Sequence, residues 1–386
     1  PEKAPANCTA ETTYNTVSLN WAKAADADGY TITRKVEGAD TEQTIAHVDG
    51  VDAVSYKDTG VQTGIIYIYH VYAYTKYTNN GQQDYANTDT YATIKAAPQL
   101  GKAALTSVTA EGYSSLTLKW EKVDGATGYI VYRSTDKSKV DTQIMDITNG
   151  AVSYVDTALT AGNTYYYKVQ PYCVVNGKKV YGDASGILSG KPLPSATKLT
   201  AESAGYKEVN LTWSAVDGVT GYEVYRKTSS SSYKKIATVA GEKTGYSDTK
   251  VTAGTAYTYK VRAYKTVNGS QVYGDYSNES TATPALEAPQ IALKNASYNS
   301  VTITWNQISG AHGYKIYRST KKDSGYRKVK TVNDKTTLTY TDKKLSVGKK
   351  YYYKVCAFRT VGDKDVAGKY SDVQTIKAAP EAVTLK

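Results

Sequence analysis

The chain has 386 residues, of which 40% are hydrophobic and 22% are charged, and its formal net charge is +11. This length indicates two to four domains, and the balance of apolar and charged residues excludes a disordered polyelectrolyte. No apolar run approaches the ~18 residues of a membrane span, and residues 1–5 have neither the basic nor the apolar part of a signal peptide. With 38 Tyr but one Phe and one Met, the composition favours β-sheets whose surfaces are half exposed.

Three landmarks recur four times along the chain in a fixed register. Tryptophans lie at spacings of 99, 93 and 92 residues, and a Gly-Tyr pair follows eight residues after each of them. Farther on, a glycine precedes a tyrosine by three positions. The tryptophans are Trp21, Trp120, Trp213 and Trp305, and the later tyrosines are Tyr67, Tyr165, Tyr257 and Tyr351. This self-similarity indicates four copies of one structural unit.

Within the third repeat, apolar and polar residues alternate with the period of a half-buried strand. The alternation over 209–213 places Trp213 on the inner face, and further strands are predicted at 222–226, 235–239 and 257–264. The Asn-Gly pair at 268–269 predicts a tight hairpin turn. Each repeat of ~93 residues therefore holds about seven short strands, as expected of an immunoglobulin-like sandwich. Apolar residues do not recur with a helical period.

The segment 159–169, Leu-Thr-Ala-Gly-Asn-Thr-Tyr-Tyr-Tyr-Lys-Val, resembles a motif of fibronectin type III domains, as do the tryptophan of the second strand and the Tyr-x-Val of the third. The resemblance implies an all-β chain of four tandem seven-stranded β-sandwiches. It also implies that the first tyrosine of each such segment is a "tyrosine corner", with its hydroxyl bonded to upstream backbone. The Val-Tyr-Arg sequences at 131–133 and 224–226 resemble versions found in secreted and surface proteins of Gram-positive bacteria. The first repeat departs from them at Ile32-Thr33-Arg34, so we expect its outer face to differ.

Proline-containing junctions predict the domain boundaries. The predicted domains span residues 1–98, 99–192, 193–285 and 286–379, and residues 380–386 look like the start of a further repeat. Linkers this short and rich in proline predict an extended rod with restricted hinges.

The charge is concentrated in the last repeat. Net charges are −5 for residues 1–98, +2 for 99–192, +3 for 193–285 and +11 for 286–386. The basic clusters of the fourth repeat are Lys321, Lys322, Arg327, Lys328, Lys330, Lys343, Lys344, Lys349 and Lys350. They predict binding of an anionic glycan or cell-wall polymer, or association of the basic fourth repeat with the acidic first repeat of another copy. A solvated face that aids solubility is the simplest interpretation of these clusters and the favoured one. Nucleic acid is not expected, since no nucleic-acid-binding motif is present.

Alternation along the long strand of the second repeat points Tyr166 and Lys168 outward, with Tyr132 beside them on the neighbouring strand. Tyr317 and Tyr352 are the equivalents in the fourth repeat. An outward aromatic stripe can stack on sugar rings, or its rings can pair across strands and stabilise the sheet. Cross-strand pairing of the rings is the simpler of these two interpretations.

Catalytic and metal-binding patterns are not found. The histidines, His47, His70 and His312, have no partners at catalytic or metal-ligand spacing. Asp26-Ala27-Asp28-Gly29 resembles the opening of a calcium loop, but the later glutamate is missing and a simple turn is favoured. The cysteines, Cys8, Cys173 and Cys356, lie at non-equivalent positions and indicate no shared disulfide framework. We therefore expect no enzyme activity, no cofactor and no metal.

Three functions fit these features. The first is an extracellular, non-catalytic spacer that presents or positions neighbouring domains at a cell surface. The second is an adhesion module that binds a polyanion through the basic fourth repeat. The third is a self-assembling surface filament, or an accessory segment of a secreted carbohydrate-active enzyme.

Overall fold

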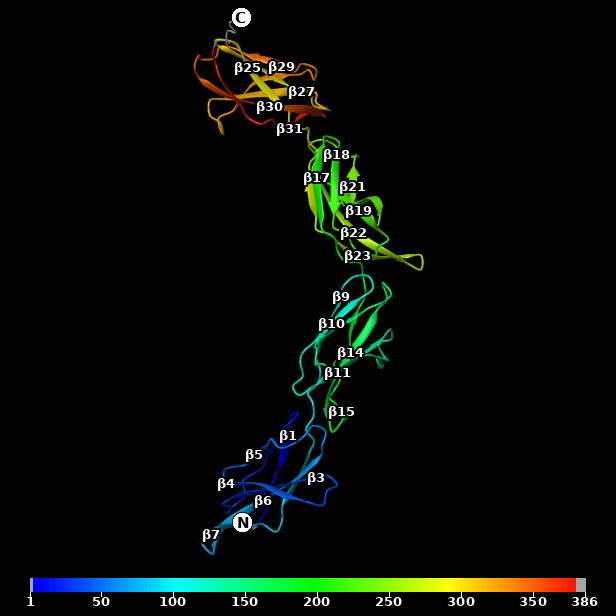
Figure 1. Ribbon diagram of the computed structural model, residues 1–386, viewed down its shortest axis with the longest axis vertical. Helices are drawn as coiled ribbons and strands as arrows, with labels where there is room; N and C mark the ends of the chain where they lie inside the picture. The colour runs from blue at the N-terminus through cyan, green and yellow to red at the C-terminus, as the bar shows by residue number, and fades with distance from the viewer. Residues whose placement is uncertain (1–2, 380–386) are drawn as a thin grey trace. The chain divides into compact units, whose positions relative to one another are not determined.

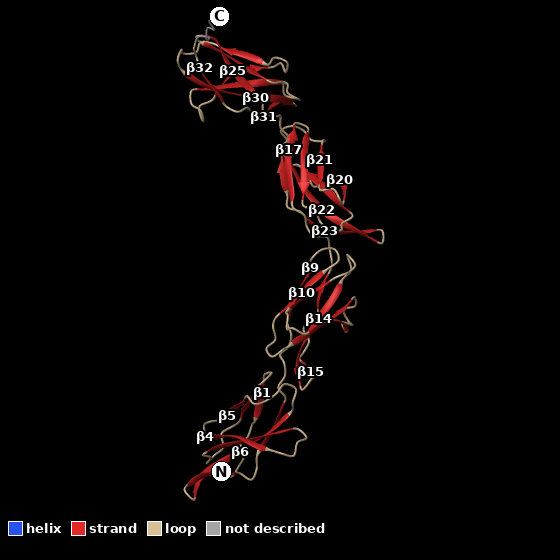
Figure 2. Cartoon of the chain, viewed as in Figure 1, coloured by secondary structure: helices blue, strands red, loops and turns tan. Residues whose placement is uncertain are grey.

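A computed structural model of the chain describes residues 3–379, so the predicted start of a further repeat at 380–386 lies outside the described residues (Figure 1). Within this range every regular element is a β-strand, and Figure 2 shows strands and loops but no helix. The strands form four tandem units, each with one three-stranded and one five-stranded sheet, which confirms the predicted all-β sandwich fold. The chain divides into two compact parts, residues 1–193 and 194–386, and each part holds two domains. The extended rod stays a prediction.

The strands of the first part follow one another at short intervals. The first domain comprises β1 (Thr9–Thr12), β2 (Val17–Asn20), β3 (Gly29–Val36), β4 (Gln43–Asp49), β5 (Ser55–Asp58), β6 (Tyr67–Asn79), β7 (Gln82–Asn87) and β8 (Ala92–Ala96). The second comprises β9 (Leu105–Ala110), β10 (Leu116–Trp120), β11 (Gly128–Ser134), β12 (Thr142–Ile147), β13 (Ser153–Asp156), β14 (Tyr165–Val175), β15 (Lys178–Tyr181) and β16 (Leu188–Gly190).

The second part repeats this order. The third domain comprises β17 (Leu199–Gly205), β18 (Glu208–Trp213), β19 (Gly221–Lys227), β20 (Lys234–Ala240), β21 (Gly245–Asp248), β22 (Tyr257–Val267), β23 (Ser270–Tyr276) and β24 (Ser280–Ala282). The fourth comprises β25 (Ile291–Ser297), β26 (Ser300–Trp305), β27 (Gly313–Ser319), β28 (Arg327–Val332), β29 (Thr339–Asp342), β30 (Lys350–Val361), β31 (Lys364–Tyr370) and β32 (Gln374–Lys377).

Each domain has eight strands rather than seven because its last strand is interrupted. In the third domain the small sheet has the order β17-β18-β21 and the large sheet the order β20-β19-β22-β23, with β24 also pairing β22. β23 pairs the second half of β22, from Arg262 onward, and β24 pairs its first three residues. Counted as one interrupted strand, β23 and β24 give the seven strands that the sequence predicts.

The landmark residues meet in the core of each domain. Trp213 and Tyr222 are buried, and their rings pack with centroids 5.4 Å apart. The Tyr222 hydroxyl also accepts a hydrogen bond from the backbone N–H of Val216 at 2.9 Å. The tryptophans of the other domains pack on the equivalent tyrosines, Tyr30, Tyr129 and Tyr314, at 5.2, 5.5 and 5.3 Å. The Trp and Gly-Tyr landmarks therefore mark one repeated packing contact.

The glycine of each Gly-Tyr pair makes room for an aromatic ring on the neighbouring strand. Gly221 is paired in register with Tyr264, and a Cβ at Gly221 would lie 2.7 Å from the Tyr264 hydroxyl oxygen. Any larger residue at this position would therefore displace the ring. The predicted hairpin turn is also present, because Asn268 and Gly269 both have positive φ, at 49° and 79°, as a type I′ turn requires.

Candidate functional site

The four predicted corner tyrosines lie at the start of the long strands β6, β14, β22 and β30. The Tyr257 hydroxyl accepts a hydrogen bond from the backbone N–H of Thr252 at 3.1 Å. The hydroxyls of Tyr67, Tyr165 and Tyr351 accept the equivalent bonds from Gln62, Thr160 and Ser346 at 3.0, 3.0 and 2.9 Å. Each hydroxyl thus holds the turn that enters its own strand.

A buried aspartate links the two sheets of every domain. Asp248, at the end of β21 in the small sheet, is 1% exposed. It accepts hydrogen bonds from Arg226 on β19 at 2.6 Å and from the Tyr259 hydroxyl on β22 at 3.0 Å. Burial and the neighbouring carboxylate raise the pKa of Tyr259, so the hydroxyl remains a donor. The equivalent sets are Asp58–Arg34–Tyr69, Asp156–Arg133–Tyr167 and Asp342–Arg318–Tyr353.

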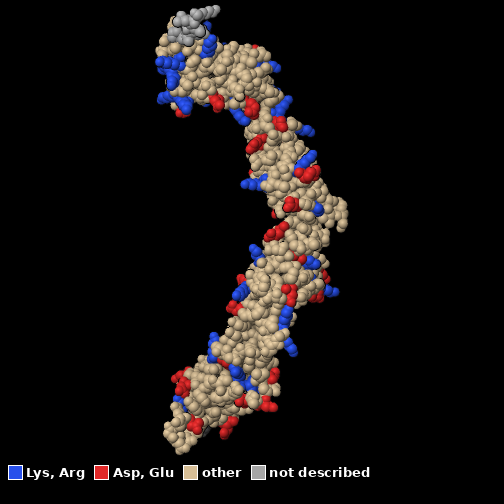
Figure 3. Space-filling model, viewed as in Figure 1, with Lys and Arg blue, Asp and Glu red and all other residues tan. Residues whose placement is uncertain are grey.

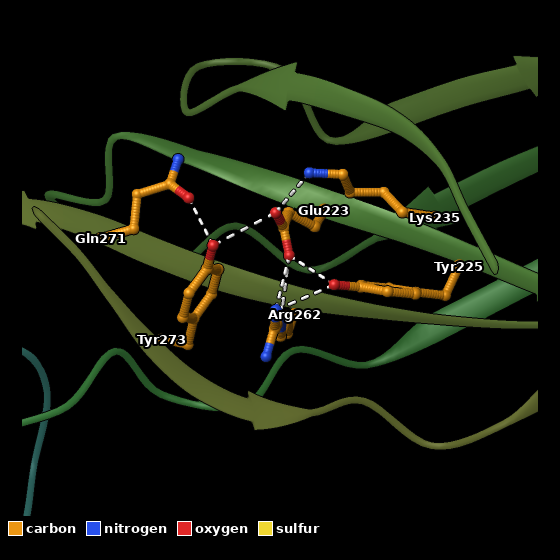
Figure 4. A network of polar contacts seen from close by, with 6 residues as sticks. All are labelled: Glu223, Tyr225, Lys235, Arg262, Gln271 and Tyr273. Carbon is orange, nitrogen blue, oxygen red and sulfur yellow. Dashed lines mark hydrogen bonds and ion pairs between the residues drawn. The ribbon is translucent and has the colours of Figure 1, made fainter. Parts of the chain in front are cut away.

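The outer face of the large sheet of the third domain carries a polar network centred on Glu223 (Figure 4). Glu223 is 2% exposed although it lies on the outer face of β19. Its carboxylate accepts hydrogen bonds from Tyr225 at 2.6 Å, Lys235 at 2.9 Å and Arg262 at 2.8 and 3.0 Å. The Tyr273 hydroxyl donates at 3.3 Å, and the Arg262 guanidinium lies 3.6 Å from the centre of the Tyr273 ring.

These contacts decide the protonation state of Glu223. Burial alone would raise its pKa, but the hydrogen bonds from Tyr225, Lys235 and Arg262 outweigh burial and lower the pKa to about 2. Both carboxylate oxygens are fully occupied by protein donors, so the network serves to fix the sheet rather than to receive a ligand. At the equivalent positions the other domains have Thr31, Ile130 and Lys315.

Beside this network, lysines lie between tyrosine rings. The Lys260 ammonium is 4.3 Å from the ring centre of Tyr233 and 3.6 Å from that of Tyr276. In the fourth domain Lys354 lies in the same way between Tyr326 and Tyr370, at 4.5 and 4.2 Å. In the second domain Lys168 lies 5.1 Å from the ring centre of Tyr132. These outward tyrosines are therefore engaged by cations within the sheet, as well as by cross-strand rings such as Tyr225 and Tyr276, whose centroids are 5.4 Å apart.

The nine basic residues that the sequence singles out in the fourth domain are all exposed. Arg327, Lys328 and Lys330 lie on β28, the edge strand of the large sheet. The other six lie in or beside the turns that join β27 to β28 and β29 to β30, namely Lys321, Lys322, Lys343, Lys344, Lys349 and Lys350. We call these six residues the basic end.

Both turns belong to the same end of the domain. Ser319, at the end of β27, is paired with Tyr352 near the start of β30, and Arg318 bonds to Asp342, which immediately precedes the second turn. Within residues 3–379 none of the nine basic residues forms an ion pair, whereas Lys315, Arg318 and Lys369 of the same domain do. Figure 3 shows lysine and arginine side chains gathered over this part of the fourth domain. The six lysines thus lie at one end of the domain, and none of them is paired with an acidic side chain within residues 3–379.

The other candidate residues have structural partners. His70 lies 2.6 Å from the Glu42 carboxylate, and the His47 ring stacks on Tyr85 with centroids 3.9 Å apart. The Asp28 carboxylate accepts the backbone N–H of Lys76 at 2.8 Å. The described residues contain no group of three or more His, Cys, Asp or Glu arranged to hold a metal, and no helix able to span a membrane.

The three cysteines are free, and they lie in different domains. Cys173 and Cys356 are buried, and burial raises the pKa of the Cys356 thiol to about 11. Cys356 is therefore protonated at neutral pH.

Comparisons with known proteins agree with this architecture. Residues 199–282 match the family model described as Fibronectin type III domain SaeA third domain. Exoglucanase B of Cellulomonas fimi is 29% identical over an alignment of 272 residues, and the alignment covers 64% of this chain and 23% of that protein. Amylopullulanase of Thermoanaerobacterium saccharolyticum is 27% identical over an alignment of 307 residues, which covers 68% of this chain and 23% of that protein. The chain thus spans less than a quarter of the length of either relative.

Among solved structures, a two-domain fibronectin type III segment of chicken tenascin covers 49% of this chain, with 17% identity and a TM-score of 0.33. The sandwich topology defines the class of protein as a tandem array of immunoglobulin-like β-domains. Together with the matched family model, it identifies the chain as four tandem fibronectin type III domains.

Proposed function

We propose that this chain is a non-catalytic extracellular spacer that presents or positions neighbouring domains at a cell surface. The observation that carries the proposal is the repetition of one internal framework. All four domains contain the same Trp–Tyr core contact, corner tyrosine and Asp–Arg–Tyr link. A chain that repeats its framework in this way supplies length and rigidity rather than a single reactive centre. No catalytic domain is evident among residues 3–379.

The relatives support a related role beside an enzyme. Exoglucanase B and amylopullulanase are named for carbohydrate-active functions, and this chain matches under a quarter of each. An accessory segment that positions a carbohydrate-active domain is therefore the form of spacer that these relatives favour. The bacterial, Gram-positive character indicated by the Val-Tyr-Arg sequences belongs to the same proposal.

A spacer should lose reach in proportion to the number of domains removed. We expect a reporter fused before residue 1 and displayed on cells through residue 386 to be captured less efficiently by an immobilised receptor when one domain is deleted. Deleting residues 99–192 should cost about as much capture as deleting residues 193–285, since reach depends on length alone. Loss of capture after deletion of one particular domain, with no effect of the other deletion, would contradict the spacer role.

The basic end favours a second candidate function, which is binding of an anionic glycan or cell-wall polymer. Its six exposed lysines are free of ion pairs within the described part of the chain, so a polyanion would meet no internal competitor. Replacing Lys343, Lys344, Lys349 and Lys350 by glutamine in the full chain should weaken retention on a heparin column. The loss should be on the order of tenfold in affinity at low salt and should shrink as the salt concentration rises.

A matched variant distinguishes binding at the basic end from attraction that depends only on the net charge of the chain. Lys137, Lys139, Lys178 and Lys191 of the second domain are also exposed, and their replacement by glutamine changes the net charge equally. Equal weakening by both variants would show that retention follows total charge, and no weakening by either would exclude the basic end as a binding site.

A further inference from the structure

Two large apolar side chains are exposed at the end of the fourth domain where β29 is joined to β30. Tyr298, in the turn between β25 and β26, is 59% exposed, and Val347, before β30, is 58% exposed. No other large apolar side chain among residues 3–379 is as exposed. Their turns are joined by a hydrogen bond from the Leu345 N–H to the Asn299 carbonyl at 2.9 Å. They therefore form one apolar patch beside the basic end.

The equivalent of Tyr298 is covered in the first and third domains. Tyr14 and Tyr206 occupy the same position, three residues before the first buried valine of the second strand. The Tyr14 ring lies against Gly125 of the second domain so closely that a Cβ there would be 2.3 Å from it. The Tyr206 ring lies against Gly310 of the fourth domain with the same separation of 2.3 Å. Both glycines have positive φ, at 79° and 78°.

A second contact closes each of these joints. Val180, on the hairpin of the second domain, fills the space over Gly64 of the first, where a Cβ would be 2.6 Å from its methyl carbon. Val366 fills the space over Gly254 in the same way, again at 2.6 Å. One tyrosine–glycine contact and one valine–glycine contact thus recur at the joint within each part of the chain. In the second part, Arg359 also lies 5.0 Å from the Tyr206 ring centre and donates to the Gly310 carbonyl at 2.8 Å.

The fourth domain carries the same surface, and no described residue from another domain covers it. Gly348 is the equivalent of Gly64 and Gly254 and has φ 79°. Among the described residues, only the Lys377 side chain comes within 4.0 Å of its Cβ position. The backbone nearby is already arranged as at the covered joints. The N–H of Gly348 donates to the Ala378 carbonyl at 2.8 Å, as Gly64 does to Pro98 at 2.8 Å and Gly254 to Pro284 at 2.9 Å.

We infer that Tyr298, Val347 and Gly348 form a docking surface for a further domain of this type that follows Ala379 in the same polypeptide. The covered joints specify two residues that this domain must carry. One is a glycine five positions after its tryptophan, to receive the Tyr298 ring. The other is a valine on its last hairpin, to fill the space over Gly348. The inference goes beyond the spacer function because it names the surface and the chemistry of its occupant.

The first domain of a second copy does not meet these requirements. Asp26 stands five positions after Trp21, where the second and fourth domains have Gly125 and Gly310. Its side chain would occupy the space of the tyrosine ring. Ala86 stands on the hairpin position of Val180 and Val366, and it is too small to fill the space over Gly348. Charge attraction between the acidic first domain and the basic end would remain, but without the two packing contacts.

The test replaces residues 379–386 of the chain by a copy of residues 193–285, which carries Gly218 and Val272 at the two required positions. Nitration of tyrosines by tetranitromethane, followed by mass spectrometry of peptides, measures how accessible Tyr298 is. We expect its nitration rate to fall by about fivefold, to that of Tyr206 in the same molecule, because the ring becomes packed against protein. A copy of residues 1–98 at the same place should leave the rate unchanged, because Asp26 and Ala86 do not fit.

Two outcomes would overturn the inference. The first is an unchanged nitration rate at Tyr298 after addition of residues 193–285, or equal protection by either copy. The second is a dimer of the unextended chain in sedimentation that Tyr298→Ser abolishes, which would make a second copy the occupant. Neither outcome affects the spacer role, which is tested by reach.

Discussion

Replacing Asp248 by alanine is expected to lower the free energy of unfolding of the third domain by about 3–5 kcal/mol, the usual effect of removing one partner of a buried ion pair. The substitution leaves the Arg226 guanidinium without its carboxylate and the buried Tyr259 hydroxyl without its acceptor. Hydrogen exchange of the full chain, read by mass spectrometry, measures this loss in third-domain peptides. Peptides of residues 1–193 should be unaffected, because they belong to the other compact part.

Two further variants make this prediction sharper. Asp275→Ala removes an exposed carboxylate from the same domain and should change stability by less than about 0.5 kcal/mol. The triple variant Asp248→Leu, Arg226→Met and Tyr259→Phe removes every member of the link together and should recover much of the loss. If Asp248→Ala costs no more than Asp275→Ala, the link does not stabilise the sandwich.

The second large effect concerns acid stability. The pKa of Glu223 is about 2 in the folded domain against an ordinary value of 4.5, and a lowering of this size corresponds to about 3 kcal/mol. Because the folded pKa is the lower one, this stabilisation is fully present above about pH 4.5 and is lost as the pH falls toward about 2. Glu223→Gln should therefore destabilise the third domain at pH 7 and flatten its stability profile across this acid range.

Hydrogen exchange of third-domain peptides, corrected for the intrinsic pH dependence of exchange, follows the profile. Glu242→Gln is the matched control, because Glu242 is an exposed glutamate of the same domain. A difference between Glu223→Gln and the unaltered chain that grows below pH 4.5 would have the wrong sign and would contradict the assigned pKa.

The fold could be predicted from sequence because its landmarks are short-range. Trp213 and Tyr222 lie on the consecutive strands β18 and β19, one in each sheet. The Asn-Gly turn at 268–269 depends on two adjacent residues. The interrupted last strand was not foreseen, since apolar alternation does not show where pairing with β22 breaks. The fourfold landmarks marked the repeats, but they did not reveal that Gly221 makes room for Tyr264 on a strand over 40 positions away.

The functional residues were harder to predict, because their contacts join segments that lie far apart in the sequence. Asp248 looks like an ordinary polar residue at a strand end, and only the packing of two sheets brings it to Arg226 and Tyr259. Glu223 occupies an outward position on its strand, and nothing in the local sequence indicates that it is buried. The pairing of β19 with β22 places it opposite Arg262, 39 residues away, and this register follows from the fold rather than from any local pattern. The basic residues were visible as runs in the sequence, but their gathering at one end was not.

The Asp–Arg–Tyr link has a consequence for how these domains behave under tension. It ties the small sheet to the large one in every domain without a covalent bond, and the chain's three cysteines are free. A domain pulled open by force can therefore close again by itself, with no oxidant, no isomerase and no risk of mispaired sulfurs. Successive cycles of stretching and relaxation should return each sandwich to the same state in reducing and oxidising surroundings alike.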